Sequence, residues 1–184
     1  MRRTAAALLV AAMAWWCQAA PFAQQSLEYE VKTQFLYNFF NFVEWPSGAF
    51  AQSDSPFRLC LVGDDPFGPL LDALVKGQAV SGHRIVIDRL VENPGIGGCH
   101  ALFISHVDDA RLAAIMNAAA HQSILIVGES RRVLELCGGI AFVVDGERVR
   151  FDINVSALAS RRLKASSKLL RLAREASDRF AHCL

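Results

Sequence analysis

Short apolar runs alternate along the chain with segments that have the periodicity and end signals of helices. Four runs rich in Val, Ile, Leu and Phe predict strands, at 57–63, 84–90, 101–105 and 124–127, and the first of these is expected to be buried. Helices are predicted between them, at 66–76, from Asp108 or Asp109 to His121, and at 130–136. This alternation favours an α/β fold of three layers, with a largely parallel sheet and helices on both faces. The chain has no linker, repeat or low-complexity block, so we expect a single domain.

The pattern changes after residue 139. Two β-rich runs, 140–144 and 148–155, flank Asp145-Gly146, which is a strong hairpin signal. Apolar and polar residues alternate along the second run and predict a strand that is buried on one face, at the edge of the sheet. A long amphipathic helix is expected from Ser156 to His182. Four basic residues share its polar arc: Arg161, Lys164, Lys168 and Arg171. They form either a solvated surface or a docking face for an acidic partner.

A further helix is predicted from Ser26 to Trp45. It ends there because the residue before a proline, here Pro46, avoids the helical region. Apolar residues fill most of its circumference and leave only a narrow polar stripe. An apolar arc of that width needs cover on more than one side. Two interpretations stay open: the helix packs deep against the sheet, or part of it is a subunit or partner interface.

The first 23 residues have the pattern of a secretory signal peptide. Two arginines precede an uncharged run that ends at Trp16, and this run is shorter than the roughly 20 apolar residues that span a bilayer. Small residues follow, and we expect cleavage within 19–23. A lipoprotein anchored at Cys17 is a weaker alternative, because Trp16 stands where a lipobox has a small residue. A buried N-terminal helix is another. The mature chain, 24–184, is expected to be a soluble domain outside the cytoplasm.

Composition and charge exclude some classes of function. The 184 residues are 53% hydrophobic and 20% charged, which disfavours a disordered chain. Lys and Arg number 19 against 18 Asp and Glu, a formal net charge of +1, so the basic excess typical of nucleic-acid binders is missing. Removal of the signal peptide takes away two arginines, and 17 basic against 18 acidic residues leave a net charge of −1.

Four cysteines remain once Cys17 leaves with the signal peptide, and an even number suits disulfides in an exported protein. Cys60 lies in the first predicted strand, and Cys99 leads into the third. A bridge between them closes a loop of about 40 residues and stabilises the fold by roughly 4 kcal/mol. We favour this bridge over a metal site, because paired Cys-x-x-Cys spacing is absent. Cys137 and Cys183 either pair with each other or stay thiols.

The sequence shows no catalytic constellation. Asp64 and Asp65 follow the first predicted strand, and a helix start explains them better than a phosphorylation pocket. Motifs of serine hydrolases, zinc proteases and phosphate loops are missing. Two functional alternatives stay open here. One is a small-ligand-binding α/β domain whose crevice at the strand ends is lined by Asp64, Asp65 and His106. The other is a thiol enzyme that uses Cys99 with His100.

Six separated stretches resemble the YfiR family of bacterial periplasmic proteins. They keep the family's order and cover nearly the whole mature chain: 30–46, 59–68, 99–105, 138–140, 148–155 and 163–173. The first reads Glu-Val-Lys-Thr-Gln-Phe-Leu-Tyr-Asn-Phe-Phe-Asn-Phe-Val-Glu-Trp-Pro, and the fifth reads Arg-Val-Arg-Phe-Asp-Ile-Asn-Val. The agreement of six separate motifs makes the resemblance specific.

The resemblance implies regulation without catalysis and without a cofactor. Family members of the best-understood type repress an inner-membrane diguanylate cyclase by binding its periplasmic sensor domain. An outer-membrane OmpA-like lipoprotein can sequester the repressor, which raises cyclic di-GMP and favours biofilm. The resemblance also implies a homodimer, and Cys60 and Cys99 match the family's disulfide.

The partner surface expected from these observations combines the predicted edge strand with the polar arc of the last helix. Its residues are Asp152, Asn154, Arg161, Lys164, Lys168 and Arg171. The function expected from the sequence is therefore that of an exported, non-enzymatic regulator.

Overall fold

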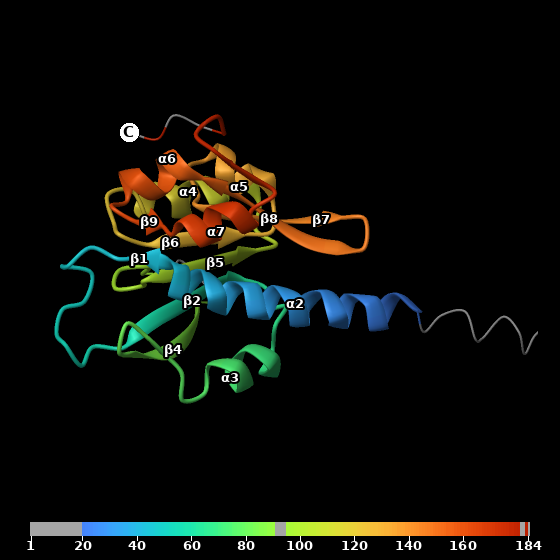
Figure 1. The fold of residues 1–184 in the computed structure, drawn as a ribbon, viewed down its shortest axis with the longest axis horizontal. Helices are drawn as coiled ribbons and strands as arrows, with labels where there is room; N and C mark the ends of the chain where they lie inside the picture. The colour runs from blue at the N-terminus through green and yellow to red at the C-terminus, as the bar shows by residue number, and fades with distance from the viewer. Residues whose placement is uncertain (1–19, 91–94, 181–182, 184) are drawn as a thin grey trace, which may run out of the picture.

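The computed structural model of the protein describes residues 20–90, 95–180 and 183. The predicted signal peptide falls, up to residue 19, outside the described residues, and so does Cys17. An eight-stranded sheet forms the centre of the molecule (Figure 1). A second, two-stranded sheet pairs β1 (Val43–Glu44) with β9 (Lys164–Ala165).

The large sheet has the strand order β10-β8-β7-β6-β5-β2-β4-β3. Its five central strands are parallel: β4 (His83–Leu90), β2 (Phe57–Gly63), β5 (Ala101–Ser105), β6 (Leu125–Gly128) and β7 (Ile140–Asp145). Two strands are antiparallel to a neighbour: β3 (Ala79–Val80) to β4, and β8 (Arg148–Asn154) to β7. The short strand β10 (Glu175–Ser177) runs parallel to β8. The predicted single α/β domain with a largely parallel sheet is confirmed.

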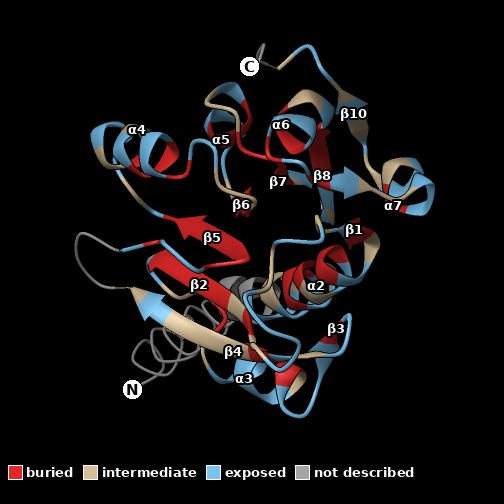
Figure 2. Ribbon diagram, turned by 90° about the vertical axis from the view of Figure 1, so that its left-hand side faces the viewer, coloured by how far each residue is buried: buried red, intermediate tan, exposed pale blue. Residues whose placement is uncertain are grey.

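Helices cover both faces of the sheet (Figure 2). One hydrophobic core lies under α2 (Ala20–Phe42), α3 (Pro69–Val75) and α7 (Ser167–Leu172), and the other under α4 (Asp109–Ala118) and α5 (Arg131–Glu135). The side chains of β2 alternate between them: Leu59 and Leu61 belong to the first core, and Cys60 and Val62 to the second. The near-continuous apolar runs of β2, β5 and β6 arise because both faces of these three strands are buried.

Helix α2 packs against the sheet along one side, as the first interpretation of its wide apolar arc predicts. Leu36, Phe39 and Phe40 are fully buried. The helix ends at Phe42 rather than at Trp45, because Val43 and Glu44 pair with β9. On its other side Leu27 is 61% exposed, so part of the apolar arc stays uncovered in the isolated chain.

The predicted hairpin is present as β7 and β8, and Figure 1 shows its end extending away from the body of the molecule. Asp145 pairs with Arg148, so the turn residues are Gly146 and Glu147, one residue later than expected. Gly146 has a φ of 61°, which suits the first central position of a two-residue hairpin turn. The predicted edge position of β8 is wrong, because β10 adds to its outer side.

The long helix predicted for Ser156–His182 is wrong. The segment contains α6 (Val155–Ser160), β9, α7 and β10. Ser166 interrupts it, because its N–H donates to the Phe42 carbonyl at 2.8 Å and its hydroxyl caps α7. The Arg174 N–H then donates to the Phe151 carbonyl at 2.9 Å and leads the chain into β10. Backbone pairing with distant segments therefore overrides the helical periodicity of this stretch.

Local capping explains most helix starts. The predicted cap of α4 is confirmed: the Asp108 side chain accepts from the Arg111 N–H at 2.7 Å. Ser130 caps α5 in the same way. The helix predicted from residue 66 begins only at Pro69, because Asp65 Oδ1 accepts from two backbone N–H groups in a turn that precedes α3.

Candidate functional site

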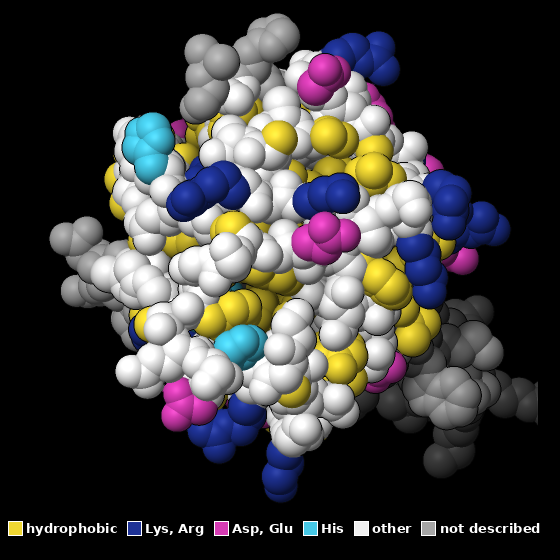
Figure 3. Space-filling view, turned by 60° about the vertical axis from the view of Figure 1, so that its left-hand side comes forward, with side chains coloured by type: hydrophobic (Ala, Val, Ile, Leu, Met, Phe, Trp, Pro, Cys, Tyr) yellow, Lys and Arg dark blue, Asp and Glu magenta, His cyan; other side chains and the backbone are white. Residues whose placement is uncertain are grey.

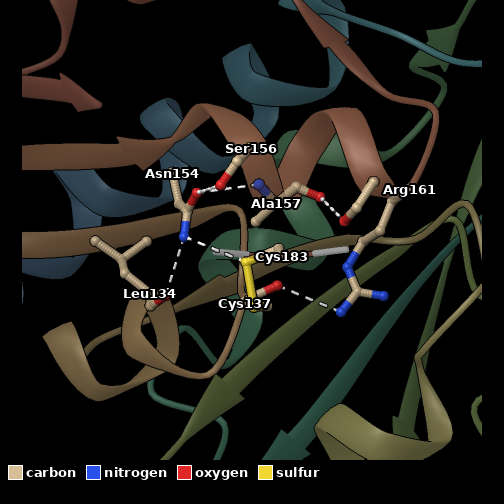
Figure 4. The surroundings of a disulfide bond; sticks show 8 residues. Leu134, Cys137, Asn154, Ser156, Ala157, Arg161 and Cys183 are labelled. Carbon is tan, nitrogen blue, oxygen red and sulfur yellow. Dashed lines mark hydrogen bonds between the residues drawn. A yellow bond between two sulfur atoms is a disulfide. The ribbon is translucent and has the colours of Figure 1, made fainter. Parts of the chain in front are cut away.

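Three of the six predicted partner-binding residues are buried. Asp152 is fully buried, and its carboxylate accepts two hydrogen bonds from Arg174, one of them 2.9 Å from Nε to Oδ1. Asn154 is fully buried, and its Oδ1 accepts from the Ala157 N–H at the start of α6 (Figure 4). Arg161 is 5% exposed. These three residues hold the fold together and cannot form an exposed partner surface in this structure, which corrects that part of the prediction.

The other three predicted residues are exposed and lie together on β9 and α7. Lys164 Nζ lies 3.8 Å from Glu44 Oε2, and Lys168 Nζ lies 4.7 Å from the ring centroid of Phe42. We call these residues with their apolar neighbour the β9–α7 surface: Lys164, Lys168, Arg171 and Leu172, the last of which is 51% exposed. Figure 3 shows separate Lys and Arg side chains over this side of the molecule, with acidic side chains among them.

A polar cluster lies where the parallel strands β2, β5 and β6 end. It joins residues that follow or end these strands to one lysine of α2: Lys32, Asp64, Ser105, His106 and Glu129. Lys32 Nζ is 2.7 Å from Glu129 Oε1, and the Ser105 hydroxyl donates to Glu129 Oε2 at 2.7 Å. We call it the carboxyl-end cluster, since the carboxyl ends of parallel strands meet at one edge of a sheet and commonly form ligand sites.

The hydrogen bonds of the carboxyl-end cluster show what it can do chemically. The Ser105 hydroxyl has one proton, which it donates to Glu129, so the Nδ1–H of His106, 2.7 Å away, donates to this hydroxyl. His106 therefore cannot take a proton from Ser105, and the pair does not form a serine nucleophile. Burial is the main cause that raises the pKa of nearby Tyr29, and the negative charge of Glu129 is the second cause. The cluster combines the buried pair of Lys32 and Glu129 with the exposed side chains of Asp64 and His106, an arrangement suited to holding polar groups.

A cavity of about 220 Å³ opens beside this cluster, lined in part by His106, Asp109, Glu129 and Arg132. The small-ligand hypothesis predicts that Asp64, Asp65 and His106 share a crevice. His106 does line the cavity, and Asp64 Oδ2 lies 3.8 Å from its Nδ1. Asp65 points elsewhere and pairs with Arg89 at 2.7 Å.

Two disulfides cross-link the described chain. Cys60 of β2 is joined to Cys99, as expected, and Cys137, which follows α5, is joined to Cys183. The thiol-enzyme alternative needs a free Cys99 beside a basic His100. The ring of His100 instead accepts from the Arg58 N–H and contacts the Ala49 carbonyl, and burial lowers its pKa. This geometry does not fit a thiol enzyme.

A family model described as YfiR/HmsC-like matches residues 29–174, which is most of the chain. The chain belongs to the YfiR/HmsC-like family. This family comprises periplasmic regulators of cyclic di-GMP signalling and is regulatory rather than catalytic. The described helices of this YfiR/HmsC-like protein include none that is both long and apolar enough to cross a membrane.

The YfiR/HmsC-like segment contains the carboxyl-end cluster, the disulfide between Cys60 and Cys99, and the β9–α7 surface. It ends before β10 and before Cys183. The second disulfide therefore ties a tail outside the matched segment to a residue within it.

Sequence reasoning missed three members of the carboxyl-end cluster in this YfiR/HmsC-like protein: Lys32, Ser105 and Glu129. A signal for Lys32 was present, because this lysine stands on the apolar arc of its helix instead of the polar stripe. Ser105 and Glu129 stand where two buried strands end. Their convergence depends on the pairing of β5 with β6, which no local pattern specifies.

Proposed function

We propose that this protein binds the periplasmic sensor domain of an inner-membrane diguanylate cyclase and represses the enzyme, which lowers cyclic di-GMP and restrains biofilm formation. The family membership supports the general role. The single observation that carries the choice of surface is the exposed β9–α7 surface, where three predicted cationic residues lie around an exposed leucine.

The charges of the β9–α7 surface are available to a partner. Lys164 has only a solvent-exposed pair with Glu44 at 3.8 Å, and exposed pairs contribute little. Lys168 and Arg171 form no ion pair with any described residue. An apolar centre with a charged rim is the common anatomy of a transient interface, and complementary charge accelerates association. An acidic patch on the cyclase sensor domain fits this surface.

The test measures binding of the mature protein to the periplasmic domain of a cyclase encoded in the same genome. Charge reversal by K164E together with K168E is expected to weaken binding by about 10- to 100-fold, measured by biolayer interferometry. In cells, the same variant is expected to raise cyclic di-GMP to the level of the deletion strain.

A matched control reverses two exposed charges near the other end of the sheet, K76E together with R84E. This control changes net charge by the same amount and is expected to bind like the wild type. Equal weakening by both double variants would show that net charge, rather than the β9–α7 surface, governs binding. No binding to any cyclase sensor domain, with unchanged cyclic di-GMP on deletion, would refute the proposed function.

We also propose that an outer-membrane OmpA-like lipoprotein sequesters this protein from the cyclase. If the lipoprotein and the cyclase compete, adding the soluble lipoprotein domain displaces the sensor domain in the same binding assay. A ternary complex at full occupancy would contradict sequestration by competition.

A homodimer is proposed through the uncovered side of α2 and the adjacent α3. Leu27, Val31 and Leu70 are exposed there, and with Leu74 they line a shallow apolar groove. A second copy would bury this surface. Sedimentation of the mature protein is expected to show a dimer, and L27K together with L70K a monomer. A wild-type monomer at tens of micromolar would contradict the proposal.

We further propose that residues 1–23 are removed during export to the periplasm. Amino-terminal sequencing of protein from the periplasmic fraction is expected to start within 20–24. Recovery from the cytoplasm with the first 23 residues intact would contradict export.

A second candidate function is binding of a small polar ligand in the cavity beside the carboxyl-end cluster. Its support is the approximately 220 Å³ cavity next to His106 and Glu129, at the edge where parallel sheets commonly bind ligands. A metabolite screen by thermal shift tests it: a ligand of this cavity gives a saturable rise in Tm that is lost in H106A. A screen without any saturable rise would exclude this candidate.

A further inference from the structure

Arg161 is a buried cation with incomplete partners. It follows α6 and is 5% exposed. Its guanidinium donates to the Ala119 carbonyl. It also donates, at 3.3 Å, to the Cys137 carbonyl, a bond that Figure 4 shows. Its Nε–H is buried and has no hydrogen-bond partner in the part of the chain that the structure describes. Arginine has five N–H donors in a planar fork, so two carbonyls leave most of this fork unused.

No carboxylate of the described residues forms an ion pair with Arg161. Its two hydrogen-bond partners among these residues are neutral backbone carbonyls. Buried charges in proteins are normally paired, because an unpaired charge in a medium of low polarity is costly. Burial accordingly lowers the pKa of Arg161.

The side chain of Arg161 lines a cavity of about 260 Å³. Asn117 and His121, at the end of α4, line the same cavity and bring an amide and an imidazole that can donate hydrogen bonds. The disulfide between Cys137 and Cys183 forms part of the wall. None of the described lining residues is acidic. Within the described part of the chain, the cavity therefore presents donors and one positive charge without a compensating negative charge.

This cavity is separate from the one beside the carboxyl-end cluster. Helix α4 begins beside the first cavity, where Asp109 and Leu112 line the wall. Its later residues Ala113, Met116 and Asn117 line the second, together with Ala120 and His121, which follow the helix. Since α4 follows β5 and returns to the start of β6, its far end lies at the amino edge of the parallel strands. The two cavities thus lie at opposite edges of the sheet.

We propose that this second cavity binds a small oxyanion, either a carboxylate or a phosphate, with Arg161 as its cationic partner. The guanidinium group pairs with both kinds of oxyanion through charge-assisted N–H bonds. Asn117 of α4 and His121, which follows this helix, supply further donors. The oxyanion neutralises the buried charge that the described residues leave unpaired.

The experiment uses the mature protein in chloride buffer, with inorganic phosphate and succinate as separate probes at matched ionic strength. Isothermal titration is expected to show saturable binding of at least one probe, and the tighter one identifies the source of the oxyanion. At about twenty times the dissociation constant, that probe is expected to raise Tm by about 4–7 °C. Absence of saturable binding for both probes would overturn the proposal.

Two variants test the role of Arg161 in different ways. R161Q removes the charge and is expected to weaken binding at least tenfold. N117D leaves Arg161 in place and adds a carboxylate to the cavity wall, so it is expected to raise Tm without any probe and to abolish the response to the probe. If R161Q does not fold, N117D still decides the question.

The control is R162Q, because Arg162 is the exposed neighbour of Arg161. It is expected to bind the probe as tightly as the wild type. Equal weakening by R162Q, or an unchanged response in N117D, would show that the probe binds elsewhere and would overturn the proposal.

Discussion

Lys32 provides a sharp test of how helix α2 is attached to the sheet. Its side chain is 5% exposed, and its Nζ lies 2.5 Å from Glu28 and 2.7 Å from Glu129. The same ammonium lies 4.5 Å from the ring centroid of Tyr29. Glu129 is 97 residues away in sequence and also accepts from Ser105, so this lysine connects α2 to the ends of two central strands.

We expect K32M to lower the free energy of unfolding by about 3 kcal/mol. Removing one partner of a buried ion pair costs about 3–5 kcal/mol, because the other charge is left uncompensated. We expect a loss at the lower end of this range for K32M. The Glu129 side chain keeps 15% exposure and its bond from Ser105, and the Glu28 side chain, 28% exposed, can turn to solvent. Such a loss corresponds to a fall in Tm of about 6–12 °C for a domain of this size.

Urea unfolding followed by tryptophan fluorescence and circular dichroism measures this loss, with the midpoint lowered and the slope m unchanged. The double variant K32M/E129Q also removes the uncompensated charge of Glu129 and is expected to regain about half of the stability that K32M loses. K76M at an exposed position is the control and is expected to change stability by less than about 0.5 kcal/mol. A K32M loss below about 1 kcal/mol, or a double variant no more stable than K32M, would refute the account of a buried ion pair.

Three further predictions concern other parts of the fold. Burial lowers the pKa of His100. The stability that the neutral ring contributes is therefore fully present above the unfolded-state pKa of about 6.5 and is lost as pH falls through the folded-state pKa. Urea unfolding at pH 7.5 and 5.5 measures the difference in stability, and H100N is expected to make this difference smaller. G63A is expected to cost more than about 3 kcal/mol, because an added Cβ would lie 1.7 Å from the Ser105 carbonyl oxygen at a φ of 87°. C60A/C99A is expected to lower stability by about 4 kcal/mol, since the disulfide closes a loop with a sequence separation of 39.

Each of these predictions has its own contrary result. The same pH dependence in H100N as in the wild type would assign it to another group. G146A is the control for G63A, because Gly146 has a φ of 61° but no atom lies within 4 Å of the added Cβ. Its expected loss of stability is about 1–2 kcal/mol. Equal losses in the two variants would show that backbone conformation alone matters. Non-reducing mass spectrometry that finds alkylatable Cys60 or Cys99 would contradict the disulfide.

The sequence alone determined the central part of this fold. The runs predicted as strands at 57–63, 101–105 and 124–127 form strands, because a strand that is buried on both faces is apolar along nearly all of its length. The sequence also predicted where α4 and α5 begin, because the side chains of Asp108 and Ser130 accept hydrogen bonds from backbone N–H groups two or three residues further along the chain. Signals of this kind act over a few residues and need no distant partner.

Only the tertiary structure decided the C-terminal third and the candidate sites. The segment after β8 has helical periodicity, yet Ser166 and Arg174 bind backbone groups of α2 and β8, so it folds as two short helices and two short strands. Asp152 and Arg161 look like surface charges in the sequence and are buried by segments that arrive from elsewhere. Lys32 and Glu129 form their ion pair although 97 positions separate them in the sequence. The energy of a buried charge depends on the groups that surround it in space, and the neighbouring residues in the sequence do not specify those groups.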